Sequence, residues 1–286
     1  MEGKVCLITG ATSGIGKATA LALARLGATV VLVSREPSRV DRAVAEIQTA
    51  TNNPNVVGMN ADLASQVQVR EFAQAFTSRF PDLHVLVNNV GALLNTHRLT
   101  SDSIEWTLAL NYLAPFLLTN LLLANLSSAG TEDARARIIN LSSSAHESAP
   151  GINFDDIQGS QRFNGNAAYA QAKLANIMFT YELARRLGDR PITVNAVHPG
   201  GVATNFGREA GIYGLIIRLM RPFLLSPEKG AETPVFLASS PTVGHITGKY
   251  FFNLQPVESS PASHDIEQQA RLWRVSEELT GLTVSI

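Results

Sequence analysis

Short runs of apolar, largely β-branched residues recur along this chain, and most stretches between them carry the periodicity of a helix. Because the runs are almost continuously apolar, they are typical of strands that are buried on both faces of a parallel sheet. Helices between such strands cover both faces of the sheet. The predicted strands span residues 5–9, 29–34, 56–60, 85–89, 138–142, 192–198 and 250–252. The predicted helices span 14–26, 39–48, 67–79, 104–126 and 167–187, with a last helix at 265–279.

The composition supports one large domain. Of the 286 residues, 45% are hydrophobic and 16% are charged, which allows a sizeable core. No linker, low-complexity tract or repeat divides the chain. We therefore predict a single α/β domain over residues 1–286, with a doubly wound sheet of seven parallel strands and helices on both faces. The formal charge of −1 argues against a nucleic-acid partner, which usually requires a basic face, and favours a small molecule.

Three features bear on the cellular compartment and on membrane insertion. The single cysteine, Cys6, lies in an apolar run and is predicted to be a buried strand residue, so no internal disulfide is expected. The chain enters its first strand without the regions of a signal peptide, and the default expectation is cytoplasmic. The leucine-rich stretch 108–126 is long enough to span a bilayer, but it contains residues that are costly in hydrocarbon, so we expect a buried helix and no transmembrane segment. These residues are Asn111, Pro115, Asn120 and Asn125.

A glycine-rich turn follows the first predicted strand and leads directly into the first predicted helix. Glycines allow the backbone to turn sharply and to approach a pyrophosphate, while the amino end of the helix offers free N–H groups. A bound dinucleotide is the ligand that this arrangement favours, beyond the carboxyl ends of the strands. The candidate contacts are Gly10, Thr12, Ser13, Gly14, Ile15 and Gly16.

The second predicted strand ends in Ser34, and Arg35 follows it. An acidic residue here would bind the ribose hydroxyls of NAD, whereas a small residue followed by arginine leaves room and charge for a 2′-phosphate. We therefore expect NADP(H) to be preferred over NAD(H), with Arg39 adding charge on the same side; the alternative is that Arg35 is simply solvated. Asp62 follows the third strand and is placed either to accept a hydrogen bond from the adenine amino group or to cap the next helix.

Tyr169 and Lys173 lie four residues apart in a predicted helix, so one turn places the phenol and the ammonium on the same face. A nearby cation favours the phenolate and lowers the pKa of a tyrosine, which would allow the pair to exchange a proton with a substrate oxygen. The alternative is a partly buried helix tyrosine beside a solvated lysine.

These features belong to an ordered series of motifs. The series is Thr9-Gly-x-x-x-Gly14-x-Gly16, Asp62, Asn88-Asn89-Val90-Gly91, Asn111, Ser142-Ser143, Tyr169-x-x-x-Lys173 and Pro199-Gly200. Over essentially its whole length the chain resembles the short-chain dehydrogenase/reductase family. Stretches 138–146, 168–176 and 196–200 are most similar to the branch of the retinol dehydrogenases and the WW-domain oxidoreductase. The resemblance implies a Rossmann fold.

The resemblance also implies roles for individual residues. Ser143 would hydrogen-bond the substrate oxygen, and Tyr169 would be the general acid in reduction and the general base in oxidation. Lys173 would lower the pKa of Tyr169 and bind the nicotinamide ribose, and the main-chain carbonyl of Asn111 would hold a water that links Lys173 to solvent. For Asn111 the alternative is a buried asparagine that bonds only to neighbouring backbone. The remaining cofactor contacts would be Leu63, Asn89, Val90, Gly91, Pro199, Gly200, Val202 and Thr204.

The segment 205–225 mixes glycines, large apolar residues and arginines. In the family this segment covers the substrate, and its apolar character indicates a lipophilic substrate. A subunit contact and a peripheral membrane contact are the other interpretations. The resemblance further implies dimers or tetramers through the helices at 104–126 and 167–187.

The sequence therefore predicts an NADP(H)-dependent oxidoreductase that interconverts a lipophilic aldehyde or ketone and its alcohol. Two alternatives are an NADP(H)-binding sensor or scaffold without turnover, and a reductase of a carbon–carbon double bond similar to protochlorophyllide reductases. No metal site is predicted, because His97, His146 and His198 have no Cys or carboxylate partners at ligand spacing.

Overall fold

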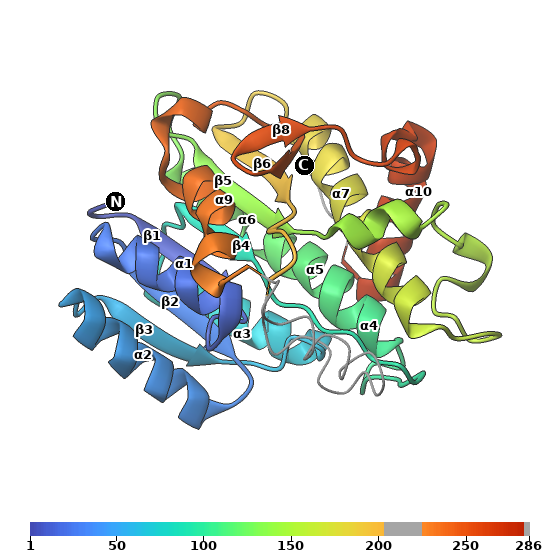
Figure 1. Cartoon of the computed structure of the whole chain (residues 1–286), viewed down its shortest axis with the longest axis horizontal. Coiled ribbons are helices and arrows are strands. Elements are labelled where there is room, and N and C mark those ends of the chain that lie inside the picture. Colours follow the sequence, from blue (N-terminus) through green and yellow to red (C-terminus); the bar gives the residue numbers. More distant parts are fainter. Residues whose placement is uncertain (203–224, 283–286) are drawn as a thin grey trace.

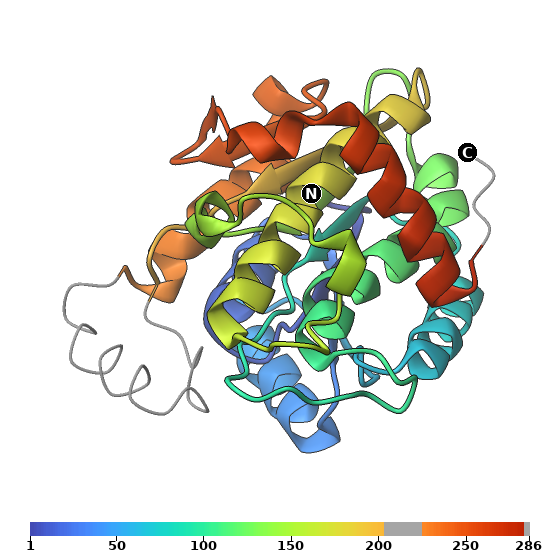
Figure 2. The same cartoon turned by 90° about the vertical axis from the view of Figure 1, so that its right-hand side faces the viewer.

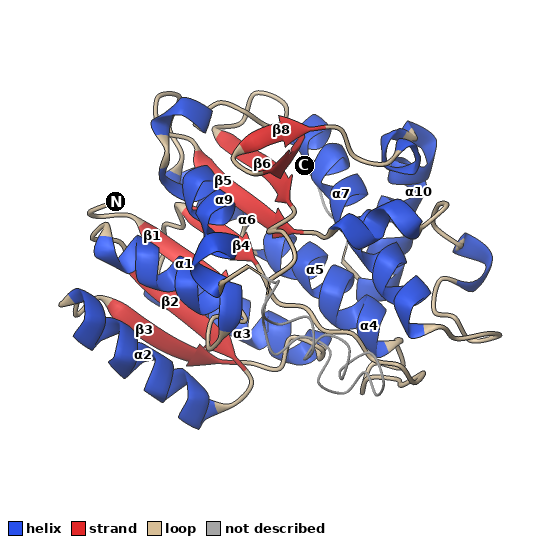
Figure 3. Cartoon of the chain, viewed as in Figure 1, coloured by secondary structure: helices blue, strands red, loops and turns tan. Residues whose placement is uncertain are grey.

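An eight-stranded sheet runs through the centre of the structure, a computed structural model that describes residues 1–202 and 225–282 (Figure 1, Figure 3). The strands are β1 (Val5–Thr9), β2 (Thr29–Ser34), β3 (Val56–Asn60), β4 (Val85–Asn88), β5 (Ala136–Leu141), β6 (Ile192–Val197), β7 (Lys249–Phe252) and β8 (Gln255–Val257). Their order across the sheet is β3-β2-β1-β4-β5-β6-β7-β8. The first seven strands pair in parallel, which confirms the predicted doubly wound sheet.

The sequence did not predict β8, which pairs antiparallel with β7 at the edge of the sheet. This strand has three residues, all exposed, and it contains Pro256, so it carries no apolar signal. A tight turn makes it form: Asn253 and Leu254 both adopt left-handed backbone conformations, with φ of 48° and 66°. That geometry reverses the chain in two residues and lays β8 against β7.

The strands bury both of their faces, which explains their continuous apolar sequence. In β1, Cys6 and Ile8 point into one hydrophobic cluster and Leu7 points into the other, as the period of two residues requires. The first cluster is covered by α1 (Gly14–Arg25), α2 (Pro37–Thr51) and α9 (Pro227–Ser239) (Figure 1). The sequence pattern did not predict α9.

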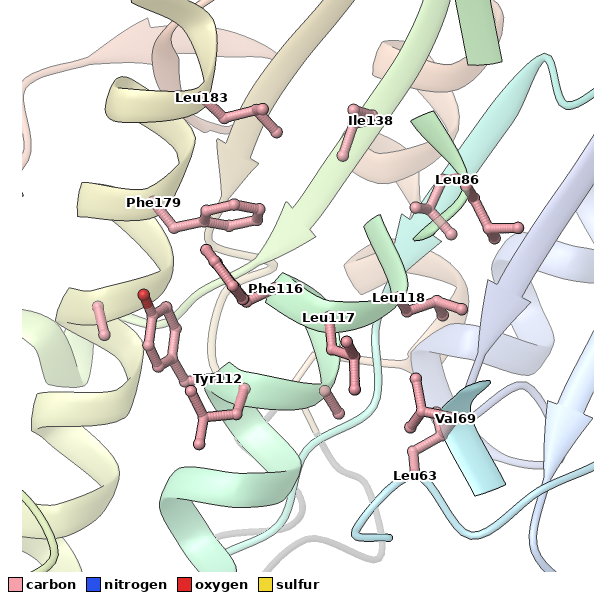
Figure 4. Close-up of a cluster of buried hydrophobic side chains, with 14 of the residues drawn as sticks. Leu63, Val69, Leu86, Tyr112, Phe116, Leu117, Leu118, Ile138, Phe179 and Leu183 are labelled. Atoms are coloured by element: carbon pink, nitrogen blue, oxygen red, sulfur yellow. The ribbon is translucent and has the colours of Figure 1, made fainter. Parts of the chain in front are cut away.

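The second cluster lies on the opposite face of the sheet (Figure 4). Phe116 and Phe179 form its aromatic centre, with ring centroids 5.4 Å apart. Trp273 packs against both rings at 5.1 and 5.9 Å. The helices of this face are α3 (Gln66–Arg79), α4 (Trp106–Leu108), α5 (Ala114–Leu121), α6 (Leu123–Ala129), α7 (Gly165–Leu187) and α10 (Ile266–Thr280), and α10 packs beside α7 (Figure 2).

The region predicted as one helix at 104–126 is broken. After α4 the chain forms a π-helical turn, Ala109–Leu113, and α5 follows. Pro115 lacks an N–H group, so the carbonyl of Asn111, four residues earlier, loses its usual helical donor. A further bend of 54° separates Trp106–Leu121 from Leu123–Ala129.

The apolar helices around this bend are rich in leucine, and they match the length of a membrane span only as a bent pair. Among the described residues no single helix is long and apolar enough to cross a bilayer, and the one bent pair just named passes by length and composition only. In the structure this pair is largely buried within the second cluster: Leu117 and Leu118, for example, are each 1% exposed. Its leucines therefore pack against protein, as the sequence analysis expected.

Candidate active site

The glycine-rich turn is fixed to the end of β4. Thr9 Oγ1 accepts hydrogen bonds from the main-chain N–H groups of Asn89 and Val90, at 2.9 and 3.0 Å. In return, Asn89 Nδ2 donates to the carbonyl oxygens of Thr9 and Gly10, at 2.7 and 3.2 Å. Thr9 was not among the predicted site residues, although a polar residue that ends an apolar strand was a signal for it. The structure thus brings the turn and segment 89–91 together.

Glycines leave space in this turn. A Cβ at Gly16 would lie 2.4 Å from Asn89 Nδ2 and 2.6 Å from the Gly10 carbonyl oxygen, and Gly10 and Gly14 have φ of 65° and 57°. Ser13 is the N-cap of α1, but its side chain makes no capping bond to the first turn. The N–H groups of this turn are therefore available to an anionic group. Thr12 and Ile15 lie half-buried in the same turn.

Two arginines extend the site at the end of β2. Arg35 and Arg39 are exposed, and the carboxylate of Glu36 lies between them, 3.9 Å from Arg35 Nε and 2.7 Å from Arg39 Nε. Two positive charges with one exposed counter-ion form a surface that suits a phosphate.

Asp62 lies at the end of β3 and does not cap α3. Its Oδ1 accepts a hydrogen bond from Ala64 N at 3.0 Å, while Ser65 is the residue that caps α3. Leu63 next to it is buried. The capping alternative for Asp62 is therefore wrong, since the helix begins after Ser65.

Ser143, Tyr169 and Lys173 come together at the end of β5. The Ser142 hydroxyl donates to the main-chain carbonyl of Lys173 at 2.8 Å and so holds α7 against this strand. The hydroxyl of Ser143 is hydrogen-bonded to Tyr169. Lys173 Nζ lies 5.5 Å from the centroid of the Tyr169 ring and donates to the Leu141 carbonyl at 3.0 Å.

The electrostatics of this group differ from the sequence prediction. Tyr169 is only half-buried as a residue, yet the loss of hydration at its hydroxyl raises its pKa, and the hydrogen bond with Ser143 opposes that rise. Complete burial lowers the pKa of Lys173 to about 8. The expected lowering of the Tyr169 pKa by Lys173 is therefore not found, because desolvation of the hydroxyl dominates and the hydrogen bond with Ser143 opposes it only in part.

Asn111 lies in the π-helical turn and is fully buried. Its Nδ2 donates to the carbonyls of Ala92 and Thr107, at 2.8 and 2.9 Å, and its Oδ1 accepts from Ala92 N at 3.1 Å. Its main-chain carbonyl accepts a hydrogen bond from Asn176 Nδ2 at 2.8 Å. No local sequence pattern points to Asn176, because its partner Asn111 lies 65 positions away in the chain.

The remaining predicted contacts lie at the end of β6. Pro199 and Gly200 are half-buried, and Gly200 has φ of 86°. Val202 pairs with Leu225 in an isolated bridge, and Leu225 N donates to the Gly201 carbonyl at 2.8 Å. Thr204 and the predicted lid at 205–225, apart from Leu225, lie outside the described residues.

The histidines have structural partners. His146 Nε2 accepts from Ser260 N at 3.1 Å, so its Nδ1 carries the proton and donates to the Ser143 carbonyl at 2.7 Å. His198 stacks on Phe252, with ring centroids 5.1 Å apart. Within the described ranges, no three His, Cys, Asp or Glu residues form a group that could hold a metal ion.

The family model described as short chain dehydrogenase matches residues 4–211. The chain belongs to the short-chain dehydrogenase family. This dehydrogenase is 41% identical to bovine (Bos taurus) retinol dehydrogenase 12 over 280 residues, which cover 98% of this chain and 87% of the relative. The relationship establishes an oxidoreductase that acts on alcohol and carbonyl groups of a small-molecule substrate.

Solved structures agree with this assignment. An uncharacterized protein from Mycobacterium paratuberculosis has a TM-score of 0.80 and 31% identity, covering 100% of this dehydrogenase and 96% of that chain. The NADP complex of Pseudomonas aeruginosa RhlG has a TM-score of 0.71 and 25% identity, covering 88% and 94%. The 3-ketoacyl-(acyl-carrier-protein) reductase of Brucella melitensis, complexed with NADH, has a TM-score of 0.69 and 27% identity, covering 87% and 96%. Both nicotinamide cofactors therefore occur among its structural neighbours.

Proposed function

We propose that this dehydrogenase uses NADP(H) to interconvert a lipophilic aldehyde or ketone and its alcohol, with reduction as the favoured direction. The observation that carries the proposal is the cluster of Ser143, Tyr169 and Lys173. A hydrogen-bonded pair of hydroxyl groups lies at the carboxyl end of a central strand, and a buried amine lies one helical turn further on. This is where an open α/β sheet binds its ligands.

The two hydroxyl groups have complementary tasks. Bound NADPH supplies the hydride, and the protein supplies orientation and a proton. Ser143 donates a hydrogen bond to the substrate oxygen and stabilises the negative charge that develops there. Because burial raises the pKa of Tyr169, its phenol is protonated at neutral pH and acts as the proton donor of the reduction. Lys173 lies beside the ring and replaces the proton that Tyr169 gives away.

Glycines shape the space that suits a dinucleotide. A side chain at Gly16 would fill the gap between the turn and Asn89, and a Cβ at Gly91 would lie 2.9 Å from Asn111 Oδ1 and 3.3 Å from Lys173 Nζ. In the proposal, the amino end of α1 would hold the pyrophosphate, and segment 89–91 would contact the adenosine ribose. Pro199, Gly200 and Val202 would frame the nicotinamide carboxamide.

The preference for NADP(H) rests on Arg35 and Arg39. Both guanidinium groups are exposed where β2 ends, the point at which this fold presents the adenosine ribose. A 2′-phosphate would take the place that the Glu36 carboxylate now holds between them. Asp62 contributes an acceptor for the adenine amino group.

A lipophilic substrate is supported by two facts. The segment 205–225 is rich in large apolar residues. The curated relative carries the name retinol dehydrogenase, and retinol is a lipophilic alcohol.

The test measures the loss of NADPH or NADH absorbance with a panel of aliphatic, aromatic and retinoid aldehydes and ketones. In Tyr169→Phe, kcat should fall by at least about 100-fold while NADPH still binds, because a positioned general acid contributes about 10²- to 10⁴-fold. Ser144→Ala, which changes an exposed neighbouring hydroxyl, is the matched control and should retain turnover. Tight NADPH binding without turnover of any carbonyl would instead favour a sensor, and turnover of an enone at its double bond would favour the other reductase class.

A further inference from the structure

We propose that Asn176 is a positioning residue that fixes the main-chain carbonyl of Asn111 as an acceptor for the water that exchanges protons with Lys173. The inference rests on the proposed function, because it concerns how Lys173 is reprotonated after Tyr169 protonates the substrate. None of the roles proposed above for individual residues involves Asn176.

The Asn111 carbonyl is released from the helix by the local sequence. In a regular helix it would accept from the N–H group four residues later, but that residue is Pro115, which has none. The π-helical turn Ala109–Leu113 places this carbonyl where Asn176 Nδ2 donates to it at 2.8 Å. The side chain of Asn111 is held separately by Ala92 and Thr107. The amide of Asn176 therefore acts on the orientation of the carbonyl itself.

Asn176 lies about one helical turn from Lys173. The two residues are three positions apart on α7 and so share one face of the helix. Lys173 Nζ and Asn111 Oδ1 border a common gap at Gly91, since a Cβ there would contact both. Asn176 Oδ1 is buried and accepts no hydrogen bond from any described residue, which is costly unless a water donates to it.

The hydrogen-bonding capacities match a single water. A carbonyl oxygen has two acceptor sites, so Asn111 retains one after Asn176 has donated. Lys173 has three N–H donors and uses one on the Leu141 carbonyl. A water that accepts from Lys173 and donates to Asn111 O and Asn176 Oδ1 completes these groups. In the reduction, Tyr169 gives its proton to the substrate oxygen, Lys173 gives one to Tyr169, and the water gives one to Lys173 and regains it from solvent.

The titratable groups at this point are Tyr169 and Lys173, both on α7. The elements packed against them contribute uncharged groups: the Asn111 carbonyl from the π-helical turn, the Leu141 carbonyl from β5, and the Ser143 hydroxyl. A substitution at Asn176 is therefore expected to change the pKa of Lys173 through hydrogen bonding and not through a change in nearby charge.

Thr180 provides a matched control on the same helix. Its hydroxyl donates to the main-chain carbonyl of Asn176 at 2.8 Å and accepts from Asn140 Nδ2 at 2.9 Å. Asn140 in turn accepts from Asn88 Nδ2 at 2.8 Å. Thr180→Val cuts this buried network and leaves the bond from Asn176 to Asn111 intact. Asn176→Leu removes that bond and leaves the network intact, because Thr180 contacts only the main chain of Asn176.

The experiment compares both variants with the native chain in two measurements. The first is kcat and KM for NADPH-dependent reduction, and the second is the titration of the Lys173 ε-amino group by NMR with labelled lysine, assigned as the resonance absent from Lys173→Met. In Asn176→Leu, kcat should fall by about 10-fold or more. KM should stay within about 2-fold, because the substitution misorients the Asn111 carbonyl and leaves substrate binding unchanged. The pKa of Lys173 should fall further, because the ammonium loses its water. Thr180→Val should change neither value, although it lowers stability.

A native kcat and an unchanged Lys173 titration in Asn176→Leu would overturn the inference. Changes of the same size in kcat and in the Lys173 pKa in Thr180→Val would also overturn it, because they would indicate general loosening of the helix. If Asn176→Leu does not fold, Asn176→Thr fills much of the same space with a hydroxyl too short to reach the Asn111 carbonyl. If the native chain reduces no carbonyl, the proposed function fails. The titration of Lys173 then still decides the inference.

Discussion

Replacing Lys173 with methionine is expected to stabilise the folded chain at neutral pH while it abolishes turnover. Lys173 is 3% exposed, and its pKa is lowered by burial from 10.5 to about 8. The unfolded chain therefore binds the lysine proton more tightly than the folded chain does. A buried amine with a lowered pKa destabilises the folded state at every pH at which the amine is charged.

The expected magnitude follows from this difference in pKa, which corresponds to about 3 kcal/mol of unfolding free energy when Lys173 is charged in both states. Methionine has a similar length and removes this penalty. It also leaves the Leu141 carbonyl without its donor, which costs about 1 kcal/mol. The net gain at neutral pH should be about 2 kcal/mol.

The dependence on pH has a defined direction. As the pH rises from about 8 to 10.5, the unfolded chain still holds the lysine proton while the folded chain loses it, so the native chain gains stability in this window. Lys173→Met has no such group. Its advantage should therefore shrink across the window, and above pH 10.5 only the cost of the Leu141 carbonyl should remain.

Urea unfolding at a series of pH values, followed by tryptophan fluorescence, measures both quantities. Lys249→Met is the control, because Lys249 is exposed at the start of β7 and its replacement should give a difference that does not vary with pH. If Lys173→Met is less stable than the native chain at neutral pH, or if the difference between them does not change with pH, the reasoning from burial is refuted.

Three further variants test other parts of the structure. In Gly16→Ala the added methyl would lie 2.6 Å from the Gly10 carbonyl oxygen, so the unfolding free energy measured in urea should fall by about 1–3 kcal/mol. NADPH binding measured by fluorescence should also weaken. Native values for both quantities would contradict this account. Arg35→Asp should weaken NADPH binding by about 10- to 100-fold, because a charged hydrogen bond contributes about 1.5–3 kcal/mol. Calorimetry that finds equal losses for NADPH and NADH would exclude the 2′-phosphate contact. Trp273→Ala should lower unfolding free energy by about 3–5 kcal/mol, since the ring is 1% exposed; a small loss in urea would mean that α10 adds little to the cooperative fold.

The sheet and much of the candidate site were predictable because their signals are local. A parallel strand that is covered on both faces needs a continuous apolar run, and the chain shows seven of them. The glycine turn, Arg35 and Ser143 then fall at strand ends, where position alone makes them candidates for ligand contacts.

Other features depend on contacts that no local pattern contains. In the sequence Asn176 is one more polar residue in a predicted helix. Its hydrogen-bond partner is a main-chain carbonyl 65 positions away, which no local pattern shows. The direction of the Tyr169 pKa depends on how much protein surrounds the hydroxyl, which spacing does not reveal. The break near Asn111 did have a signal in Pro115, but a run of leucines dominated the helical pattern.

The bridge between Val202 and Leu225 allows the segment between them to change in evolution without a change in the sheet. The residues that flank segment 203–224 are joined by a hydrogen bond from Leu225 N to the Gly201 carbonyl, next to Gly200, which we propose to contact the nicotinamide. A segment whose ends are already joined can gain, lose or exchange residues at little entropic cost to the rest of the chain. If this segment covers the substrate, as the resemblance implies, the reacting residues on the sheet can be inherited unchanged while replacement of this one stretch changes the substrate.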